Sequence, residues 1–133
     1  MRRRIRTGLV AAAIAAVAVA GIGGPASARS YDGFCESGEV CLYWGGNYYG
    51  GLADFSNTIY NYRSFTFKGS GAGAGQSLND NSASARSKAR LLEVILCTNS
   101  YFGGECFEMS PGDAYPDLGP DFNNELSSHF WHG

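Results

Sequence analysis

The segment LYWGGNYYGG, residues 42–51, has an altered copy in ILCTNSYFGG, residues 95–104, which begins 53 positions further along the chain. In both copies an apolar run leads into a short polar stretch, two aromatic residues and a Gly-Gly pair. A polar cluster follows each copy, NDNSAS at 79–84 and NNELSS at 123–128. A strand hairpin followed by an Asn/Asp/Ser loop, present twice, predicts two copies of one supersecondary unit.

The remainder of the chain has the pattern of short strands. No segment after residue 29 shows a sustained 3.6-residue apolar period, whereas short apolar or alternating runs recur between turn-forming residues. Frequent turn signals between such runs favour an all-β sandwich or barrel. We expect the glycine-rich segment 69–75 (GSGAGAG) to be a mobile spacer. The expected strands include 40–44, 60–62, 65–67, 91–96, 106–109 and 129–131.

The first 28 residues have the three parts of a secretory signal peptide. Four arginines between positions 2 and 6 precede the apolar run Leu9–Ile22, and Ala26-Ser27-Ala28 supplies small residues for cleavage. The apolar run is shorter than the roughly 20 residues that a membrane-spanning helix needs. We therefore predict a signal peptide over 1–28, cleavage before Arg29, and a secreted, extracellular protein without a membrane anchor after processing.

The predicted mature chain, residues 29–133, is the length of a single domain. It keeps six Lys and Arg residues against twelve Asp and Glu residues, a net charge of −6. An acidic domain repels phosphate backbones, so we expect no nucleic-acid partner. We expect the protein to be a monomer.

All four cysteines lie in the predicted mature chain, and an even number in an exported protein indicates disulfides. We favour the pairs Cys35–Cys41 and Cys97–Cys106, because each pair is close in sequence and flanks a plausible turn. The other two pairings remain open at this point. A zinc site is the alternative, but five and eight intervening residues are not the spacings of common zinc knuckles.

The repeated hairpin resembles the Greek key of the βγ-crystallin superfamily, which opens with an aromatic-x4-aromatic-x-Gly segment. Two registers of the first hairpin fit that form, Tyr43/Tyr48/Gly50 and Trp44/Tyr49/Gly51. In the second hairpin Phe102 and Gly104 fit, with Cys97 in place of the leading aromatic. The aromatic pair packs across a folded hairpin, and the glycine takes a backbone angle that a Cβ would forbid. The resemblance implies a sandwich of two Greek keys, about 38–89 and about 90–133, stapled by disulfides.

More narrowly, the chain is similar to a secreted bacterial peptidase-inhibitor family whose type member is a Streptomyces metalloproteinase inhibitor. The matching features are the signal peptide, CESGEVC at 35–41, the Leu-Tyr strand after it, the Tyr-Phe-Gly-Gly hairpin, and the Asn-Asp-x-x-x-Ser loop before Arg86. The resemblance implies inhibition of an extracellular protease, with metalloproteases as the candidate class, by insertion of a rigid loop into the cleft. The candidate inhibitory residues, between Cys97 and Cys106, are Thr98, Asn99, Ser100, Tyr101 and Phe102.

The two polar clusters resemble the calcium loop of βγ-crystallins, [Asn/Asp]-[Asn/Asp]-x-x-[Ser/Thr]-Ser. Residues 123–128 match at every position, whereas 79–84 has Ala83 where a hydroxyl is expected. Calcium takes six to eight oxygen ligands. Asn, Asp and Ser also bond their own backbone in turns that hold no metal, so a purely structural role is the alternative. The residues that the resemblance implies for calcium are Asn123, Asn124, Glu125, Ser127, Asn79 and Asp80.

We expect no enzymatic activity and no required cofactor. Catalysis needs a nucleophile, a base and an orienting group in contact. The only histidines, His129 and His132, lie in the closing strand, where we expect them at the surface. The acid pairs 113/117 and 105/108 resemble an acidic surface more than the carboxylates of a glycosidase.

Two further functions compete with inhibition. One is a structural module that calcium stabilises. The other is a secreted toxin or glycan-binding protein, for which an exposed aromatic face is the expected feature. The residues that would form such a face are Tyr43, Tyr48, Tyr49, Tyr60 and Tyr62.

Overall fold

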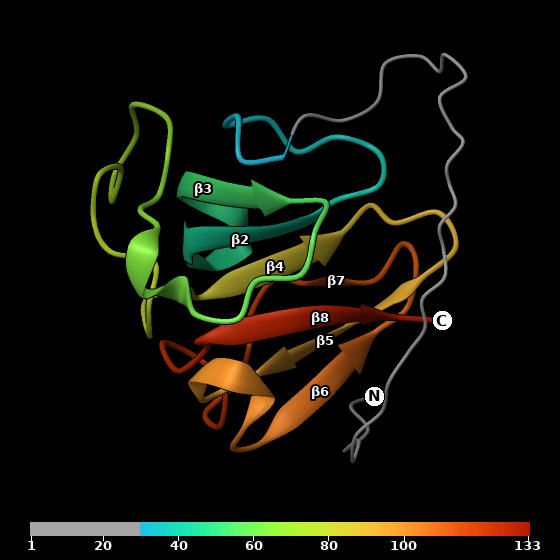
Figure 1. Cartoon of the computed structure of the whole chain (residues 1–133). Helices are drawn as coiled ribbons and strands as arrows, with labels where there is room; N and C mark the ends of the chain where they lie inside the picture. The colour runs from blue at the N-terminus through green and yellow to red at the C-terminus, as the bar shows by residue number, and fades with distance from the viewer. Residues whose placement is uncertain (1–29) are drawn as a thin grey trace.

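The computed structural model describes residues 30–133, so the predicted signal peptide lies outside the described part of the chain. The described residues form strands joined by short 3-10 turns (Figure 1). The strands are Val40–Gly45 (β2), Tyr49–Phe55 (β3), Ser84–Ser87 (β4), Glu93–Cys97 (β5), Cys106–Met109 (β6), Ala114–Tyr115 (β7) and Ser128–His132 (β8). The 3-10 turns are Gly46–Tyr48 (η2), Tyr62–Ser64 (η3) and Ser100–Phe102 (η4).

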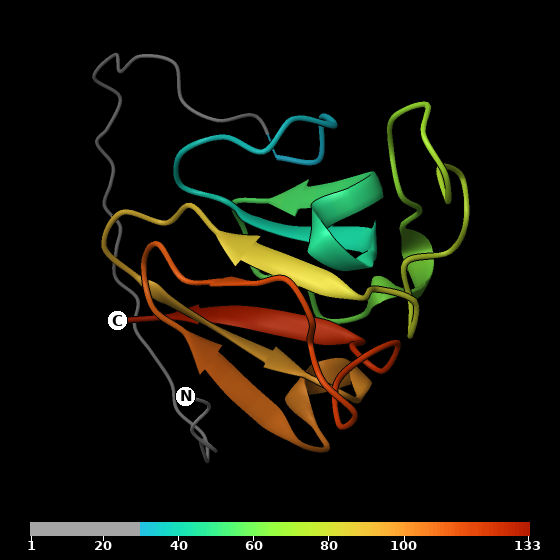
Figure 2. The same ribbon diagram turned by 180° about the vertical axis from the view of Figure 1, so that it is seen from behind.

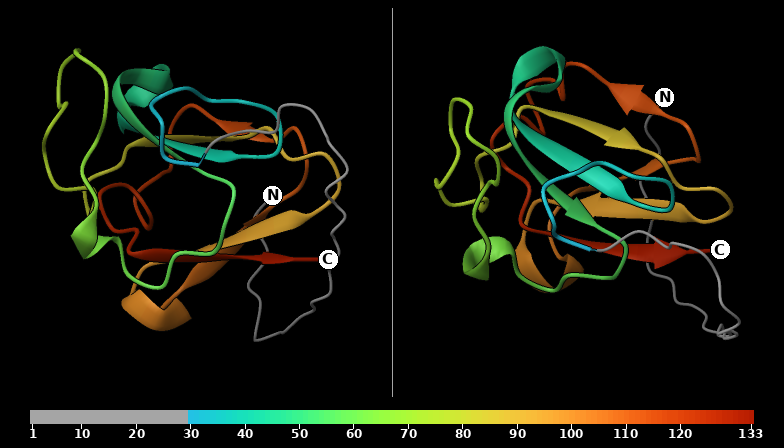
Figure 3. Two further views of the ribbon diagram at one scale, coloured as in Figure 1. Left: turned by 45° about the horizontal axis from the view of Figure 1, so that its top comes forward. Right: turned by 90° about the horizontal axis from the view of Figure 1, so that it is seen from above.

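The strands make two antiparallel sheets that face each other (Figure 3). The first has the order β3-β2-β4-β7 and the second has the order β6-β5-β8. Strand β7 comes from the second repeat but completes the first sheet. Reciprocally, Ile59 of the first repeat forms an antiparallel bridge with His129 of β8 in the second sheet. Each repeat thus sends one segment to the other sheet, which is the Greek-key crossing that the resemblance to βγ-crystallins implies.

The core lies between the sheets and is built by strand alternation. In β2 the side chains of Val40 and Leu42 are fully buried, and they lie opposite Phe55 and Ala53 of β3. Strand β5 begins at Glu93 rather than Leu91, which is 87% exposed, so the expected strand at 91–96 starts two residues late. The buried apolar side chains from both repeats include Tyr62, Phe67, Leu78, Leu96, Phe107, Met109, Leu118, Phe122 and Leu126.

The structure selects one register for the first hairpin. The rings of Tyr43 and Tyr48 pack edge to face at 5.5 Å, and Gly50 has φ +86°. A Cβ on Gly50 would lie 2.5 Å from the carbonyl oxygen of Ala72, so the close approach requires glycine. The equivalent residues of the second hairpin are Cys97, Phe102 and Gly104. Matching these two sets of residues gives an offset of 54 residues between the hairpins. The 53-residue alignment of the two segments, which pairs Tyr49 with Phe102, is therefore wrong by one position.

The glycine-rich segment is ordered by contacts, so the expectation of a mobile spacer is wrong. Figure 2 shows it, in yellow-green, beside the β2–β3 hairpin. The amide of Gly51 donates to the carbonyl of Ala72, and Leu52 forms a bridge with Lys68. Gly73 has φ +81°, and a Cβ there would lie 2.1 Å from the Trp44 indole ring. The small residues let the loop lie flat on Trp44, which a composition rule for linkers does not anticipate.

The stretches 60–62 and 65–67 do not form regular strands as their alternation suggested. Tyr62–Ser64 is a 3-10 turn, capped by the Asn61 side chain, which accepts from the amide of Arg63. Isolated bridges hold Ile59 and Thr66 on either side of it. The buried Tyr62 ring stacks on Phe55 at 6.2 Å, so packing on the core replaces strand pairing here.

His129 is fully buried in the core, contrary to the expectation of a surface position. Its Nε2 lies 2.8 Å from the carbonyl oxygen of Asn57, which can only accept, so Nε2 carries the proton. The hydroxyl of Tyr62 therefore donates to Nδ1 at 2.7 Å. Burial lowers the pKa of His129 from 6.5 to about 4, although the bond to Asn57 acts in the opposite direction.

We predict that this histidine makes the fold sensitive to acid. A histidine with a lowered pKa stabilises the native state above its unfolded pKa, and that stability is lost as the pH falls from 6.5 toward 4. The loss at low pH is about 3 kcal/mol. The double variant His129→Phe/Tyr62→Phe removes the imidazole without leaving the Tyr62 hydroxyl unpaired. Urea unfolding from pH 7 to pH 4 should show the wild type losing stability relative to this variant.

His132→Gln serves as the matched control, since this second histidine is the last residue of the same strand. Its urea unfolding is measured over the same pH range, so that the effect of the buried imidazole is judged against the removal of another histidine from the strand. If the difference between wild type and double variant is constant across the pH range, the buried neutral histidine does not cause the acid sensitivity.

Candidate functional site

The loop between β5 and β6 is closed at its base by a disulfide. Cys97 pairs with Cys106, which is directly opposite it in the sheet, and Cys35 pairs with Cys41. Both predicted pairings are confirmed, and the described residues include no free cysteine. The disulfide brackets the candidate inhibitory residues 98–102.

Backbone hydrogen bonds hold this loop in one shape. The amide of Thr98 donates to the carbonyl of Glu105 at 3.0 Å, and the Thr98 hydroxyl accepts from the amide of Glu105 at 3.0 Å. Inside that pair, the amide of Asn99 donates to the carbonyl of Gly103. Gly104 has φ +78°, and a Cβ on it would meet the Thr98 hydroxyl at 2.2 Å. The loop therefore folds back over its own strands.

One serine hydroxyl fastens each folded hairpin to its sheet. Ser128 Oγ donates to the carbonyl of Asn99 at 2.6 Å and accepts from the amide of Phe102 at 3.0 Å. In the first repeat Ser84 Oγ makes the same two bonds, to the carbonyl of Gly45 and from the amide of Tyr48. Ser84 and Ser128 are the last residues of the polar clusters 79–84 and 123–128, so each cluster anchors the hairpin of its own repeat.

The second hairpin contributes to a partly exposed group of rings, here called the aromatic cluster. It is formed by Tyr60, Tyr101, Phe102 and Phe130. The ring of Tyr60 lies 5.9 Å from that of Tyr101 and 5.2 Å from that of Phe102, and Phe102 packs on Phe130 at 4.9 Å. Tyr101 is 69% exposed and Tyr60 is 56% exposed. The amide of Tyr101 donates to the carbonyl of Tyr60 at 2.8 Å, which joins the two repeats at this surface.

The five tyrosines expected for a glycan-binding face do not lie on one surface. Tyr43 and Tyr62 are buried, and Tyr48 packs on Tyr43 in the first hairpin. Tyr60 belongs instead to the aromatic cluster, and Tyr49 is exposed at the first hairpin. Phe102 and Phe130 complete the aromatic cluster. The sequence does not predict their contact, because it depends on the pairing of β5 with β8.

The two polar clusters lie against each other. The amide of Asp80 donates to the carbonyl of Leu126, and the amide of Asn124 donates to the carbonyl of Ser82. Asp80 and Asn124 occupy the same position in their clusters and share the left-handed conformation, with φ 55° and φ 59°. The Ser127 hydroxyl donates to Asp80 Oδ1 at 2.9 Å.

This pairing decides which candidate calcium ligands come together. Ser127 of the second cluster lies with Asp80 of the first, so a cation here would draw on both repeats. Asn79 Oδ1 and Ser82 Oγ are buried without a hydrogen-bond partner, and both are oxygen atoms of the kind that calcium takes. The residue types and these orphaned oxygens fit a calcium ion. Asn123, Asn124 and Glu125 are exposed on the second cluster.

One of the two acid pairs, Asp113 and Asp117, holds turns. Asp113 Oδ2 accepts from the amide of Ser110, and Asp117 Oδ1 accepts from the amide of Gly119. Such bonds are the ordinary role of aspartate in turns.

In the described part of the chain no helix has the length and apolar character to span a membrane.

Comparison with solved structures shows the fold. A solved structure from work on the evolution of the eye lens βγ-crystallin domain fold has a TM-score of 0.59 and 20% identity to this chain. The match covers 81% of this chain and 92% of that chain. A βγ-crystallin from Ciona intestinalis has a TM-score of 0.54 and 18% identity, over 70% and 98%. A βγ-crystallin domain from Flavobacterium johnsoniae has a TM-score of 0.53 and 23% identity, over 69% and 91%. The chain has the βγ-crystallin fold.

The family model gives a narrower assignment. Among curated proteins, none matches this chain. The model of peptidase inhibitor family I36 matches residues 28–109, which contain the whole first repeat, both disulfides and the β5–β6 hairpin. The match covers more than half of the sequence, and it agrees with the resemblance that the cysteine and hairpin motifs carry. This chain belongs to peptidase inhibitor family I36.

Proposed function

We propose that this protein is a secreted, monomeric inhibitor of an extracellular protease and that it docks on the enzyme through the aromatic cluster. Family membership supports inhibition, and the signal-peptide pattern and two disulfides support an extracellular setting. Metalloproteases are the target class to test first, following the resemblance to the Streptomyces metalloproteinase inhibitor. The function needs no catalytic residue and no cofactor.

The observation that carries this proposal is the exposure of Tyr101 on a loop that is fixed on all sides. The disulfide, the Ser128 hydroxyl and the backbone bond to Tyr60 all hold the segment before any partner arrives. A preorganised loop loses little conformational entropy on binding, so more of its contact energy appears as affinity. Tyrosine and phenylalanine also offer large contact areas with few rotatable bonds.

The conformation of η4 determines how the loop would dock. Tyr101 and Phe102 have φ 55° and φ 66°, which is the left-handed region and not the extended conformation of a strand. The loop therefore does not present these two residues as an extended, substrate-like segment. It would act as a rigid wedge, with Tyr101 entering an apolar pocket and Tyr60 and Phe130 contacting its rim.

We predict that Tyr101→Ala weakens inhibition of the target protease by about 10- to 100-fold, because truncation of a central aromatic anchor is costly. Tyr49→Ala is the matched control, since Tyr49 is 61% exposed on the first hairpin and lies outside the cluster. Inhibition constants would be measured for wild type and both variants against a panel of thermolysin-like and serine proteases.

Equal inhibition constants for Tyr101→Ala and wild type would show that the aromatic cluster is not the docking surface. An absence of inhibition across the panel would remove the function itself. A glycan array probed in parallel with the same proteins tests the glycan-binding alternative, which a Tyr101-dependent signal would favour.

A second candidate function is calcium binding at the paired polar clusters. The buried, unpartnered Asn79 Oδ1 and the Ser127–Asp80 contact favour it. When bound there, calcium would supply charge compensation and crosslink the two repeats. Its ligands would be Asp80, Asn79 and Ser127, with Asn124 at the equivalent position of the other cluster.

We predict that about 10 mM calcium stabilises the wild type by about 1.4 kcal/mol over EDTA if the dissociation constant is about 1 mM, as for extracellular modules. Ser127→Ala should reduce this gain, because the hydroxyl would be a ligand. Ser110→Ala, at an exposed turn, is the control. Chemical unfolding with and without calcium measures the gain, and an identical gain in Ser127→Ala and wild type would contradict calcium binding at these clusters.

A further inference from the structure

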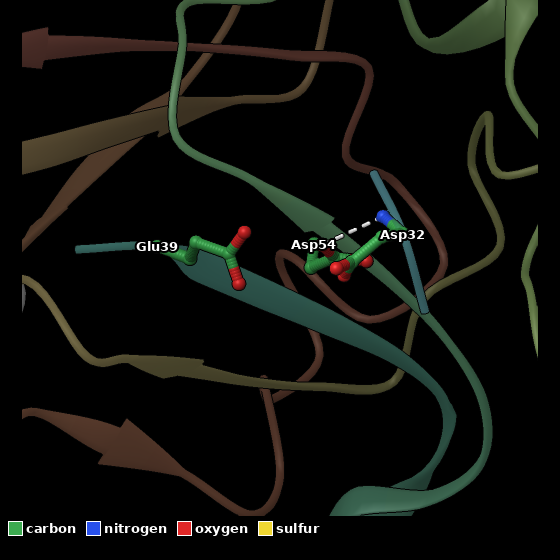
Figure 4. A group of neighbouring side chains, drawn as sticks. All are labelled: Asp32, Glu39 and Asp54. Atoms are coloured by element: carbon green, nitrogen blue, oxygen red, sulfur yellow. Dashed lines mark hydrogen bonds between the residues drawn. The ribbon is translucent and has the colours of Figure 1, made fainter. Parts of the chain in front are cut away.

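A separate group of carboxylates lies at the other end of β2 from the polar clusters. Asp32, Glu39 and Asp54 each place a carboxylate oxygen within 4.8 Å of the others, and we call them the carboxylate triad (Figure 4). Asp32 belongs to the segment before the first disulfide, Glu39 precedes β2, and Asp54 lies near the end of β3. The three side chains converge although they come from three different segments.

Two members of the triad are withdrawn from water completely. Glu39 and Asp54 have no exposed surface, and Asp32 is partly exposed. Asp54 accepts from the amides of Asp32 at 3.0 Å and Gly33 at 2.8 Å, one on each oxygen. Since each carboxylate oxygen has two lone pairs, both oxygens of Asp54 can still accept another partner.

Glu39 has one oxygen that is buried and unsatisfied. Its Oε1 accepts from the amide of Glu36 at 2.7 Å, whereas its Oε2 has no hydrogen-bond partner. Figure 4 shows this carboxylate directed toward Asp54 and Asp32. Burying an unpaired carboxylate is expensive, so this atom requires a proton or a cation.

The charged groups around Glu39 increase its need for a proton or a cation. Asp54 and Glu36 both act on it with the same sign of charge. Burial raises the pKa of Tyr43, on the same sheet; Arg86 lowers this pKa and Asp54 raises it. The basic side chains on the neighbouring segments are engaged elsewhere: Lys88 Nζ donates to Cys35 O, Lys68 Nζ lies over the Tyr31 ring, and the Arg86 guanidinium lies over the Tyr48 ring.

We propose that the carboxylate triad is a binding site for a calcium ion, distinct from the paired polar clusters. The point nearest to all three oxygens lies no more than about 2.8 Å from each, close to the calcium–oxygen range of about 2.3–2.6 Å. Three carboxylates supply hard oxygen ligands and more than the charge of a divalent ion. Partly exposed Asp32 leaves an open side where water completes the coordination.

The ion would clamp the N-terminal segment to the first sheet. The amide of Tyr31 already donates to the carbonyl of Asp54, and the Tyr31 ring stacks on Phe55 at 5.5 Å. The Cys35–Cys41 disulfide closes the short loop that contains Glu39. Calcium would add a third connection to this same junction and stabilise the native state by mass action.

A proton is the competitor for the same oxygen. Burial raises the pKa of Glu39 to about 8, and burial also raises the pKa of Asp54, so without a cation the pair retains a proton at neutral pH. In the absence of calcium, stability should fall as the pH rises from 4.5 to about 8, because the native state binds the extra proton in that window. Calcium must displace this proton, so its affinity should increase with pH up to about 8.

The test is isothermal titration of the secreted protein with calcium chloride at pH 6.0, 7.5 and 9.0. Ser127→Ala serves as the background, because it weakens any site at the polar clusters. In that background Glu39→Gln keeps the shape and one acceptor but removes the charged ligand. Asp32→Asn is a second variant at the partly exposed member, and Glu93→Gln on β5 is the matched control.

The triad site predicts one calcium ion per chain in Ser127→Ala and in its Glu93→Gln derivative. Affinity should be at least tenfold weaker with Glu39→Gln or Asp32→Asn. It should be higher at pH 9.0 than at pH 6.0, and binding should release a proton at pH 6.0. Equal calcium binding in the Glu39→Gln derivative would overturn the proposal. So would the absence of binding in Ser127→Ala, in which case the triad holds only a shared proton.

Discussion

The two serine hydroxyls that fasten the hairpins are the interaction from which the rest of this structure follows. Each folded hairpin contains two consecutive non-glycine residues in the left-handed region, Asn47–Tyr48 and Tyr101–Phe102, which is an unfavourable conformation. Ser84 and Ser128 offset that cost, because each hydroxyl satisfies one carbonyl and one amide that the turn leaves without a strand partner. The polar clusters that supply these serines therefore have a structural task whether or not calcium binds to them.

The aromatic cluster is a product of the exchange of segments between repeats. Tyr60 comes from the segment that the first repeat sends toward the second sheet, and it meets Tyr101 on the second hairpin. The first hairpin differs, since Tyr48 packs on Tyr43 and the glycine-rich segment covers Trp44, which leaves Tyr49 as the exposed ring beside Trp44. Two copies of one motif thus present different surfaces, and the exposed surface with a disulfide at its base is the one suited to a partner.

Buried ionisable groups act on this fold in opposite directions. His129 is neutral in the core, so it stabilises the native state above its unfolded pKa. Glu39 and Asp54 retain a proton when they are buried, so they stabilise the native state at lower pH. The two effects oppose each other between about pH 4.5 and 6.5. A cation at the proposed triad site would remove the second effect, so the stability of the protein would then depend on the calcium concentration.

Local features of the sequence determined the fold class, the repeat, the two disulfides and the family, because these depend on residue type and short spacing. The cysteine pairs were predictable since each closes a short loop, and the hairpin since aromatic and glycine positions report a local shape. Only the tertiary structure decided the hairpin register, the packing of the glycine-rich segment on Trp44 and the burial of His129, because long-range pairing outweighs local pattern. The same reason applies to the sites: Tyr60 with Tyr101, Ser127 with Asp80, and Glu39 with Asp54 are distant in sequence, and only the packing of two exchanged Greek keys brings them together.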